Sequence, residues 1–411
     1  MTTPKHIPSG YKPSPLGPIP EDWEVKRLGE IFTFKNGVNA GKDSYGEGVR
    51  FVNTMDVLNN EYITGKILRG RVAINEKTKN EFLVSFGDVL FNRTSETREE
   101  VGCSTVYLDN EDAVFGGFVI RAHDIDAIIL NPRFKQYCFQ PSYIRNQISA
   151  LGNGAIRYNL GQEDLSKVNL LIPTKVEQEA IVSVISLWDT AIEKQTALIE
   201  QLTLRKRGLM QQLLTGKKRL KGFEGGSFHR LGNYISECNR RNNGCNRVLS
   251  VTNTRGFILQ EEQFDKIVAS NDTSNYKVVR RGEFAYNPSR VNVGSLAMLK
   301  EYDEGILSPM YIVFKANENI DKTYLLQCLQ SWWFRGHIPA YTQGSVRDSL
   351  SFDGLCSMKF YIPTLQEQKA ISAILERADK EIEIQKQKLA AMQEQKKGLM
   401  QVLLTGKRRI K

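Results

Sequence analysis

One long stretch of sequence occurs twice in this chain. Residues 173–217 and 363–407 both open with Pro-Thr, continue with Glu-Gln, and close with Gly-Leu-Met-Gln-x-Leu-Leu-Thr-Gly-Lys. Each position in the second copy follows its equivalent by one constant interval (363 − 173 = 190), so the copies align without a gap. A repeat at fixed spacing constrains the architecture more than any local pattern does. We therefore expect one structural unit to be built twice.

Each copy has the pattern of a single long amphipathic helix. Apolar residues recur at helical spacing between Glu, Gln, Lys and Arg residues, which favour helix. Thr174 and Thr364 stand at N-cap positions, each three residues before a Glu, which is capping-box spacing, and Gly216 and Gly406 end the pattern. About forty residues at a rise of 1.5 Å give a length of roughly 60 Å. The apolar repeat predicts that the two helices pair as a coiled coil. The residues expected to form the pairing face are Ile181, Ile185, Trp188, Ile192, Leu202, Leu209, Ile371, Leu375, Ile382, Leu389, Met392 and Leu399.

The segments that precede the two helices resemble each other more faintly. Both contain short apolar runs typical of strands, separated by glycine turn signals, and both read as mixed α/β domains. The predicted fold class is α/β, with two such domains, two long helices and an internal pseudo-two-fold repeat. The proline-rich first residues read as an extended or loosely held arm. The predicted divisions are an N-terminal arm (1–22), a first domain (23–172), a central helix (173–220), a second domain (221–361) and a C-terminal helix (362–411).

Composition excludes several classes of protein. No apolar run approaches the roughly 20 residues that span a bilayer, and the first residues lack the apolar core of a signal peptide. The six cysteines form no Cys-x-x-Cys pair, and the four histidines are scattered, so neither a disulfide framework nor a metal site is expected. These features predict a cytoplasmic protein. A net charge of +10 points to a polyanion such as nucleic acid.

Two copies of one scaffold with different surfaces indicate two related tasks on different targets. A basic protein with two such domains and a rigid spacer fits a reader of two separated sites on DNA, since equivalent grooves recur about every 34 Å. A coiled-coil scaffold that binds only proteins and a stand-alone DNA adenine methyltransferase are the alternatives.

Polar loops at matching places in the two domains are the candidate DNA contacts. One pair follows a strand-like run, and the other is a loop of glycine, polar residues and arginine, whose groups can bond to phosphates or base edges. The candidate residues are Lys35, Asn36, Asn92, Arg93, Thr94, Ser95, Asn153, Arg157, Tyr158, Asn159, Arg240, Arg241, Asn287, Ser289, Arg290, Gln343, Ser345, Arg347 and Asp348.

One motif could indicate catalysis. Tyr286-Asn287-Pro288-Ser289 approaches the Asn-Pro-Pro-Tyr box with which amino-methyltransferases hold a flipped adenine. The second proline and the following aromatic residue are missing, and no glycine-rich loop offers a cofactor site. We therefore assign no catalytic, cofactor-binding or metal-binding residue to this chain.

The motifs resemble a known family. The order domain, helix, domain, helix is similar to that of the specificity (S) subunits of type I restriction-modification systems. So are Ile-Pro-x-x-x-Glu-Gln before each helix, the Leu-Leu-Thr-Gly-Lys ending, and the opening Pro20-Glu21-Asp22-Trp23. The second domain lacks that Pro-Glu-Asp-Trp opening, which we interpret as drift.

The resemblance implies a non-catalytic subunit with two target-recognition domains. Each domain would read one half of a bipartite, asymmetric DNA sequence, and antiparallel helices would set the unread spacer. Two methyltransferase (M) subunits, which carry S-adenosylmethionine, would dock on the helices and domains. Restriction (R) subunits could join through that core.

Overall fold

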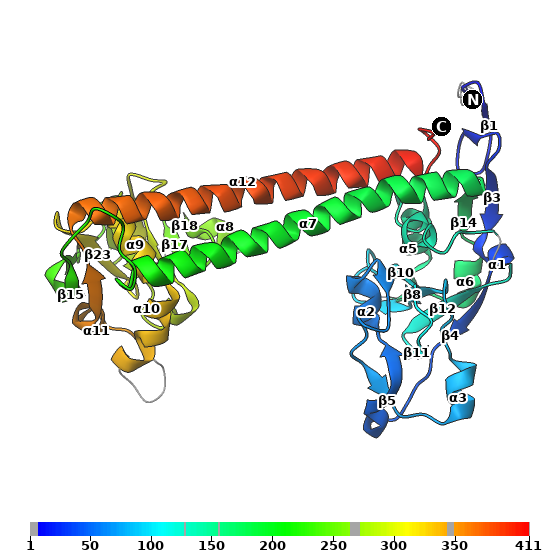
Figure 1. The fold of residues 1–411 in the computed structure, drawn as a ribbon, viewed down its shortest axis with the longest axis horizontal. Helices are drawn as coiled ribbons and strands as arrows, with labels where there is room; N and C mark the ends of the chain where they lie inside the picture. Colours follow the sequence, from blue (N-terminus) through cyan, green and yellow to red (C-terminus); the bar gives the residue numbers. More distant parts are fainter. Residues whose placement is uncertain (1–6, 127–128, 155–156, 264–271, 343–348, 411) are drawn as a thin grey trace. The chain divides into compact units, whose positions relative to one another are not determined.

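The computed structural model describes residues 7–126, 129–154, 157–263, 272–342 and 349–410. The chain forms two compact units: unit 1 comprises residues 1–194 and 389–411, and unit 2 comprises residues 195–388. Each of the two long helices (green and orange to red in Figure 1) therefore contributes one part to each unit. The domain boundaries given above remain predictions.

The two long helices are α7 (Lys175–Leu213) and α12 (Leu365–Leu403), each of 39 residues. In unit 1, Ile181 and Ile185 at the start of α7 share a core with Met400 at the end of α12. In unit 2 the start of α12 packs in the same way against the end of α7. The helices are therefore antiparallel and paired, as the repeat and the family resemblance predicted.

The expected pairing residues differ in burial. Ile181, Ile185, Ile371, Leu375 and Ile382 are buried. The other seven are half-buried: Trp188, Ile192, Leu202, Leu209, Leu389, Met392 and Leu399. The periodicity did not indicate the polar pair Gln195 and Gln385, where the buried amide of Gln195 donates to the Gln385 side-chain oxygen at 2.8 Å. A largely buried polar pair between helices favours a single register.

Both helices begin with the predicted threonine N-cap but lack the rest of the capping box. Oγ1 of Thr174 accepts a hydrogen bond from the Glu177 amide at 3.4 Å, and Thr364 accepts one from Glu367 at the same distance. Each glutamate side chain turns instead to an arginine that follows the other long helix. A charge-assisted bond between guanidinium and carboxylate is stronger than a bond to a neutral amide. The capping-box prediction was therefore correct for the threonines and wrong for the glutamates.

These glutamates form one ion pair in each unit. Arg409 Nε donates to Glu177 at 2.7 Å in unit 1, and Arg219 Nε donates to Glu367 at 2.9 Å in unit 2. Both carboxylates are buried. Arg409 and Glu367 follow Arg219 and Glu177 by the repeat interval of 190 residues. The repeated sequence therefore makes the same ion pair in each unit.

The glutamines beside these glutamates repeat a second set of bonds. Gln178 accepts from the backbone N–H of Asn131 at 2.8 Å and donates to the Pro173 carbonyl at 3.0 Å. Gln368 makes the equivalent bonds, to Asp321 at 2.7 Å and to Pro363 at 2.9 Å. A buried amide that satisfies several backbone groups is costly to replace. These glutamines therefore anchor each domain to the first turn of the helix that follows it.

The Pro-Glu-Asp-Trp opening packs against the glycine that follows α12. Gly406 has φ +68°, and a Cβ there would lie 2.6 Å from Pro20 and 3.3 Å from Trp23. In unit 2, which lacks this opening, a Cβ on Gly216 would lie 2.7 Å from the Tyr361 ring. An aromatic ring from a different part of the sequence therefore occupies the corresponding place.

Residues 7–22 of the predicted N-terminal arm fold back on themselves and are held in place. Strands β1 (Tyr11–Lys12) and β2 (Ile19–Pro20) pair, Tyr11 Oη donates to the Gly406 carbonyl at 2.7 Å, and Ile19 is buried.

Unit 1 has a five-stranded sheet in the order β4-β12-β8-β10-β6 and a three-stranded sheet β11-β5-β7. Its elements after the arm are β3 (Glu24–Arg27), α1 (Leu28–Ile31), β4 (Phe32–Asn36), η1 (Lys42–Ser44), β5 (Tyr45–Val52), α2 (Thr54–Asn59), β6 (Tyr62–Ile63), β7 (Arg71–Val72), α3 (Glu76–Glu81), β8 (Val89–Asn92), β9 (Thr94–Ser95), β10 (Ser104–Tyr107), β11 (Ala113–Phe115), β12 (Val119–Asp124), α4 (Lys135–Cys138), α5 (Ser142–Leu151), β13 (Tyr158–Asn159), α6 (Gln162–Ser166) and β14 (Asn169–Ile172).

Unit 2 has a four-stranded sheet in the order β16-β23-β20-β21. Its elements before α12 are β15 (Ser227–Arg230), η2 (Leu231–Asn233), β16 (Ile235–Glu237), β17 (Leu249–Thr252), β18 (Gly256–Leu259), α8 (Gln260–Gln263), β19 (Lys277–Arg280), β20 (Phe284–Tyr286), η3 (Val291–Val293), β21 (Leu296–Met298), β22 (Glu304–Leu307), β23 (Ile312–Ala316), α9 (Lys322–Gln330), α10 (Trp332–His337), η4 (Ile338–Tyr341), α11 (Phe352–Ser357) and β24 (Lys359–Ile362). The order matches β4-β12-β8-β10 of unit 1, so the faint resemblance between the domains reflects a common sheet.

Candidate nucleic-acid interface

The structure brings together the two candidate loops of unit 1. Strand β9 directly follows the buried strand β8, and it pairs with β13, which follows the glycine-arginine loop. Tyr158 lies opposite Ser95 and Asn159 lies opposite Thr94, where Thr94 Oγ1 donates to Asn159 Oδ1 at 2.8 Å. Thr94 and Asn159 are 65 positions apart in the sequence. The strand pair thus brings the two loops together on one surface.

The glycine-arginine loop is closed by a backbone pair. Asn153 and Asn159 exchange N–H to carbonyl bonds of 3.0 and 2.8 Å. Gly154, inside the loop, has φ +139°, and a Cβ there would lie 1.9 Å from the Arg157 carbonyl oxygen. Only glycine fits this backbone. The closed loop holds Arg157 on the surface, exposed, with its nearest carboxylate on Glu96 at 3.9 Å.

Two of the four candidates that follow β8 shape the loop. Asn92 is buried and donates to the Glu100 carbonyl at 3.2 Å, and Ser95 donates to the Glu100 carboxylate at 2.8 Å. Arg93 donates to the Gly117 carbonyl at 3.2 Å and stays half-exposed, as does Thr94. The side chains that this loop offers to a ligand are therefore those of Arg93 and Thr94.

One cation at this surface, Arg98, was not among the residues predicted from the sequence. The guanidinium of Arg98 lies 5.2 Å from the ring centroid of Tyr158, and the side chain is exposed. Arg98 lies among the acidic residues Glu96, Glu99 and Glu100, so the local sequence does not mark it as part of a basic surface. Its contact with Tyr158, in the other candidate loop, places Arg98 at this surface, and that contact is visible only in the folded structure.

Unit 2 repeats the junction between these loops. The Leu160 N–H donates to the Arg93 carbonyl at 2.9 Å in unit 1, and the Leu350 N–H donates to the Pro288 carbonyl at 3.1 Å in unit 2. Arg290 is exposed beyond this junction.

The remaining candidates at the unit 2 junction differ in exposure. Asn287 is buried, and its Oδ1 accepts from the N–H of the exposed Ser289 at 3.1 Å. The candidates Gln343, Ser345, Arg347 and Asp348 lie outside the described residues.

Four further candidates lie at other places and are partly engaged within their own domain. Lys35 pairs with the Glu81 carboxylate at 3.0 Å and lies over the Phe82 ring; Asn36 ends β4 and is half-buried. Arg240 pairs with the buried Glu283; burial by itself would lower the pKa of Arg240, but its bond to Glu283 raises it. Arg241 is exposed and donates to the Asn275 carbonyl at 2.6 Å.

The motif that approached a methyltransferase box is part of the core. Tyr286 is fully buried, its hydroxyl donates to the Leu350 carbonyl at 3.1 Å, and burial raises its pKa. A stacking aromatic must be open to the base that it holds.

Within the described residues, no group of three or more His, Cys, Asp or Glu side chains is placed to hold a metal ion. No helix among the described residues is long and apolar enough to cross a membrane.

Comparison with known proteins agrees with this architecture. The family described as "Type I restriction modification DNA specificity domain" matches residues 20–204 and 234–394. The chain is 24% identical to the putative type I restriction enzyme MjaX specificity subunit of Methanocaldococcus jannaschii, covering 98% of this chain and 97% of that protein. It is also 24% identical to the MjaVIII specificity subunit of the same organism, covering 96% of this chain and 94% of that protein.

Solved structures show the same fold. The S subunit of a type I restriction-modification system from M. genitalium matches with a TM-score of 0.51 and 16% identity, covering 93% of this chain and 96% of the other. A chain from a structure that describes complex assembly and conformational transition of the type I R-M system matches with a TM-score of 0.59 and 16% identity, covering 95% of this chain and 99% of the other.

Proposed function

Since the chain belongs to the type I restriction-modification DNA specificity family and is a non-catalytic subunit of such a complex, we propose that each unit reads one half of a bipartite, asymmetric DNA sequence. The observation that carries this proposal is the paired-loop surface of unit 1, together with the backbone bond at its junction, which recurs in unit 2 between Leu350 and Pro288 beside different side chains. Unit 1 offers Arg93, Thr94 and Arg157 there, and unit 2 offers Ser289 and Arg290.

The side chains on these surfaces suit DNA recognition. Arginine can form paired bonds to guanine or phosphate, and hydroxyl and amide groups can bond to base edges. Asn153 and Asn159 are exposed beside Arg157, and Tyr158 carries Arg98 on its ring. We propose that this surface enters a groove, and that Arg98 contacts the backbone.

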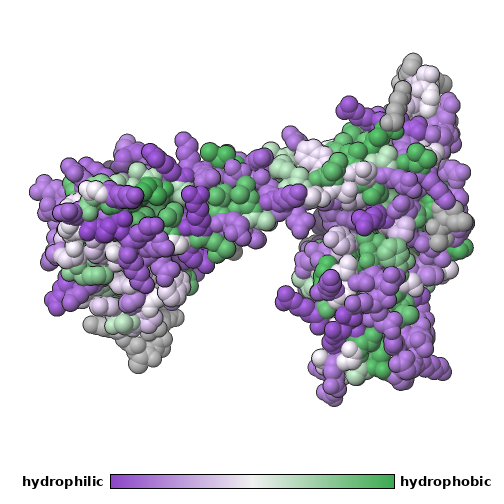
Figure 2. Space-filling view, viewed as in Figure 1, coloured by the Kyte–Doolittle hydropathy of each residue, from purple (hydrophilic) through white to green (hydrophobic). Residues whose placement is uncertain are grey.

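The paired helices are proposed to set the spacer and to dock partners. A helix of 39 residues is about 58 Å long at a rise of 1.5 Å per residue, longer than the roughly 34 Å that separates equivalent grooves. Exposed apolar side chains are interspersed with polar ones along both helices (Figure 2), including Val176, Leu187 and Leu204 on α7 and Ile384 on α12. Such positions suit contact with another protein. We propose that two methyltransferase subunits, which bring S-adenosylmethionine, dock there in the cytoplasm, and that restriction subunits join this core.

The test is a pair of single substitutions with separate expected effects. The target is first identified by mapping methylated adenines in cells that carry the system. We then expect Arg157→Ala to weaken binding of the assembled complex to one half-site about tenfold, because one arginine contact is lost, and Arg290→Ala to do so at the other half-site. Affinity is measured on duplexes in which one half-site is scrambled at a time.

Arg281→Ala is the matched control, because Arg281 is an exposed arginine of unit 2 that pairs with Asp303 at 3.0 Å. It should leave both half-sites unchanged. Equal weakening of both half-sites by either test variant would contradict the division of recognition between the units.

A further inference from the structure

A groove in unit 2 carries aromatic and cationic side chains that the proposed DNA surface does not use. It encloses about 850 Å³ between the last turns of α7, helix α10 and the paired strands β15 and β24. The lining residues that matter are Arg207, Lys217, Phe228, Trp332, Trp333 and Arg335.

The two adjacent tryptophans differ in exposure, and Trp332 is the exposed one. The Trp333 ring stacks on His337 at a centroid distance of 4.2 Å and contacts the Phe360 ring at 5.2 Å. Trp332 is 74% exposed, and Phe228 in the same groove is 56% exposed. Exposed aromatic side chains that line a hollow mark binding surfaces, and tryptophan is prominent among the residues that carry binding energy in protein interfaces.

The charged side chains that line the described part of this groove are all cationic. Lys206, Arg207, Lys217 and Arg335 line it, and none of its described lining residues is Asp or Glu. Lys206 pairs with Asp379 at 2.5 Å, whereas the described residues offer the other three no ion pair. A segment that carries both carboxylates and apolar side chains complements this lining. A DNA backbone supplies negative charge but no apolar groups for Trp332 and Phe228, so a protein segment fits better.

Unit 1 contains a groove at the equivalent place, of about 1030 Å³. Lys396 and Lys397 line it where unit 2 has Lys206 and Arg207. One repeat interval before Trp332 stands Ser142, next to the lining residue Pro141. Ser142 turns to the helix and donates to Gln401 at 3.1 Å. The exposed tryptophan therefore has no equivalent in unit 1.

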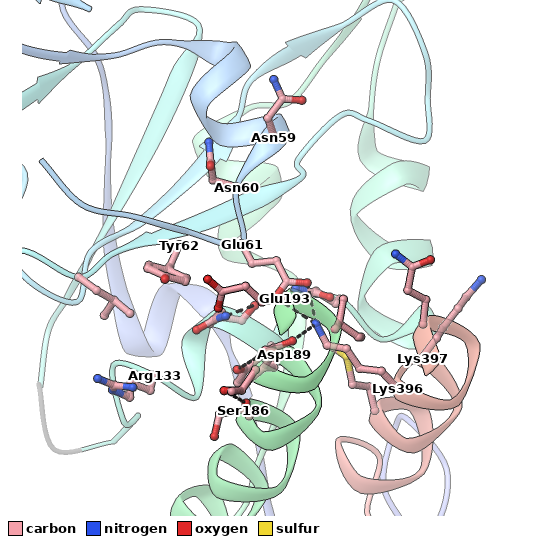
Figure 3. A pocket seen from close by; sticks show the side chains of 18 of the residues that line it. Asn59, Asn60, Glu61, Tyr62, Arg133, Ser186, Asp189, Glu193, Lys396 and Lys397 are labelled. Carbon is pink, nitrogen blue, oxygen red and sulfur yellow. Dashed lines mark hydrogen bonds and ion pairs between the residues drawn. The ribbon is translucent and has the colours of Figure 1, made fainter. Parts of the chain in front are cut away.

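The unit 1 groove also holds its own carboxylates. Figure 3 shows Lys396 pointing at Asp189 and Glu61, at distances of 2.5 and 2.8 Å, with Glu193 also in the lining. Burial by itself would lower the pKa of Lys396, but the bonds to these carboxylates outweigh it and raise the pKa. An acidic segment would meet like charge here.

We infer that the unit 2 groove binds an acidic, apolar segment of one methyltransferase subunit and that the unit 1 groove binds the same segment of a second copy less tightly. The inference rests on the proposed function, because it names the docking chemistry of that partner. Two grooves at repeat-equivalent positions fit two copies of one partner, and their different lining makes assembly stepwise.

Titration of the full-length chain with its purified methyltransferase subunit, followed by calorimetry and native mass spectrometry, tests the inference. We expect two binding steps whose affinities differ by about tenfold or more, since tenfold needs only one or two altered contacts. Trp332→Ala should weaken the tighter step about 30-fold, as for a central aromatic contact. Arg207→Glu should weaken the tighter step about tenfold by charge reversal.

Lys397→Glu, at the repeat equivalent of Arg207, is the matched control and should leave the tighter step unchanged. Circular dichroism should show an unchanged melting temperature for each variant. Two equal binding steps in the wild-type chain, or no effect of Trp332→Ala on either step, would overturn the inference while leaving the proposed function in place. Loss of DNA affinity or of restriction-subunit binding, without loss of methyltransferase binding, would overturn it as well. If the wild-type chain binds no methyltransferase subunit, the proposed function itself fails.

Discussion

The two units share an internal frame and differ at their surfaces. Gln178 and Gln368 make equivalent bonds, and the ion pair of Lys396 with Asp189 repeats as that of Lys206 with Asp379, both at 2.5 Å. The repeated positions are those where a helix meets a domain or the other helix. Contacts of this kind depend on a few buried polar groups whose partners are fixed, so the same residues must stand at the same places.

The differences lie where side chains face outward. Ser142 in unit 1 occupies the position of Trp332 in unit 2. Glu61 adds a second carboxylate beside Lys396, whereas among the described residues Lys206 pairs with Asp379 alone. These side chains do not determine how a helix packs. One frame can therefore hold two surfaces of different chemistry, as the proposed recognition of two different half-sites requires.

The largest expected effect tests whether the frame is equivalent in the two units. Gly406→Ala and Gly216→Ala should each destabilise their own unit by about 3 kcal/mol, because a left-handed residue with a Cβ costs about 1–2 kcal/mol and the new Cβ also overlaps a neighbour. That neighbour is Pro20 at 2.6 Å for Gly406 and Tyr361 at 2.7 Å for Gly216. Hydrogen exchange of peptides from each unit measures the free energy of opening.

Gly398→Ala and Gly208→Ala are the matched controls for this comparison. Both glycines lie inside the long helices with no atom within 4 Å of an added Cβ. Alanine should therefore stabilise each unit by up to about 1 kcal/mol. If only one of the two variants, Gly216→Ala or Gly406→Ala, destabilised its own unit, the ends of the two helices would not be equivalent.

The next effect should distinguish the two units. Lys396→Ala should cost about 2 kcal/mol, less than the 3–5 kcal/mol typical of fully buried pairs, because Glu61 is still partly exposed. Lys206→Ala should cost under about 1 kcal/mol, because only one partly exposed carboxylate, that of Asp379, is left unpaired. The same hydrogen-exchange measurement compares them. Equal losses would mean that Glu61 adds nothing to the unit 1 pair.

The smallest effect is a dependence on pH that arises from Asp22 of unit 1. The hydrogen bond from Arg409 lowers the pKa of Asp22 below its ordinary value of 3.8. The contribution of Asp22 to stability is therefore complete above that ordinary value and is lost as the pH falls through the lowered pKa. The side chain is about half exposed, so the effect is modest.

Thermal unfolding of the wild-type chain and of Asp22→Asn, followed from about pH 5 to pH 3, measures it. The difference between the two proteins should shrink as the pH falls. A constant difference would show that the ion pair with Arg409 does not account for the contribution of Asp22.

Much of the molecule followed from the sequence. The repeat predicted two long helices, their pairing and the threonine caps, because periodic apolar residues and local side-chain-to-backbone bonds depend only on neighbours along the chain. Motifs in and around the repeat indicated the family. Sequence alone also placed Arg93, Arg157 and Arg290 among the candidate contacts, since loops that combine glycine, polar residues and arginine recur at matching places.

Only the tertiary structure decided the remaining features. It paired β9 with β13, turned Glu177 and Glu367 from their caps to Arg409 and Arg219, and put Arg98 over Tyr158. Partners in these contacts lie far apart in most cases, up to 232 positions for Arg409 and Glu177, so no local pattern encodes them. Burial likewise separated Asn92, which shapes a loop, from Arg157, which faces outward, although both residues are polar loop residues in sequence. Which side chain meets solvent depends on what packs against it from elsewhere in the chain.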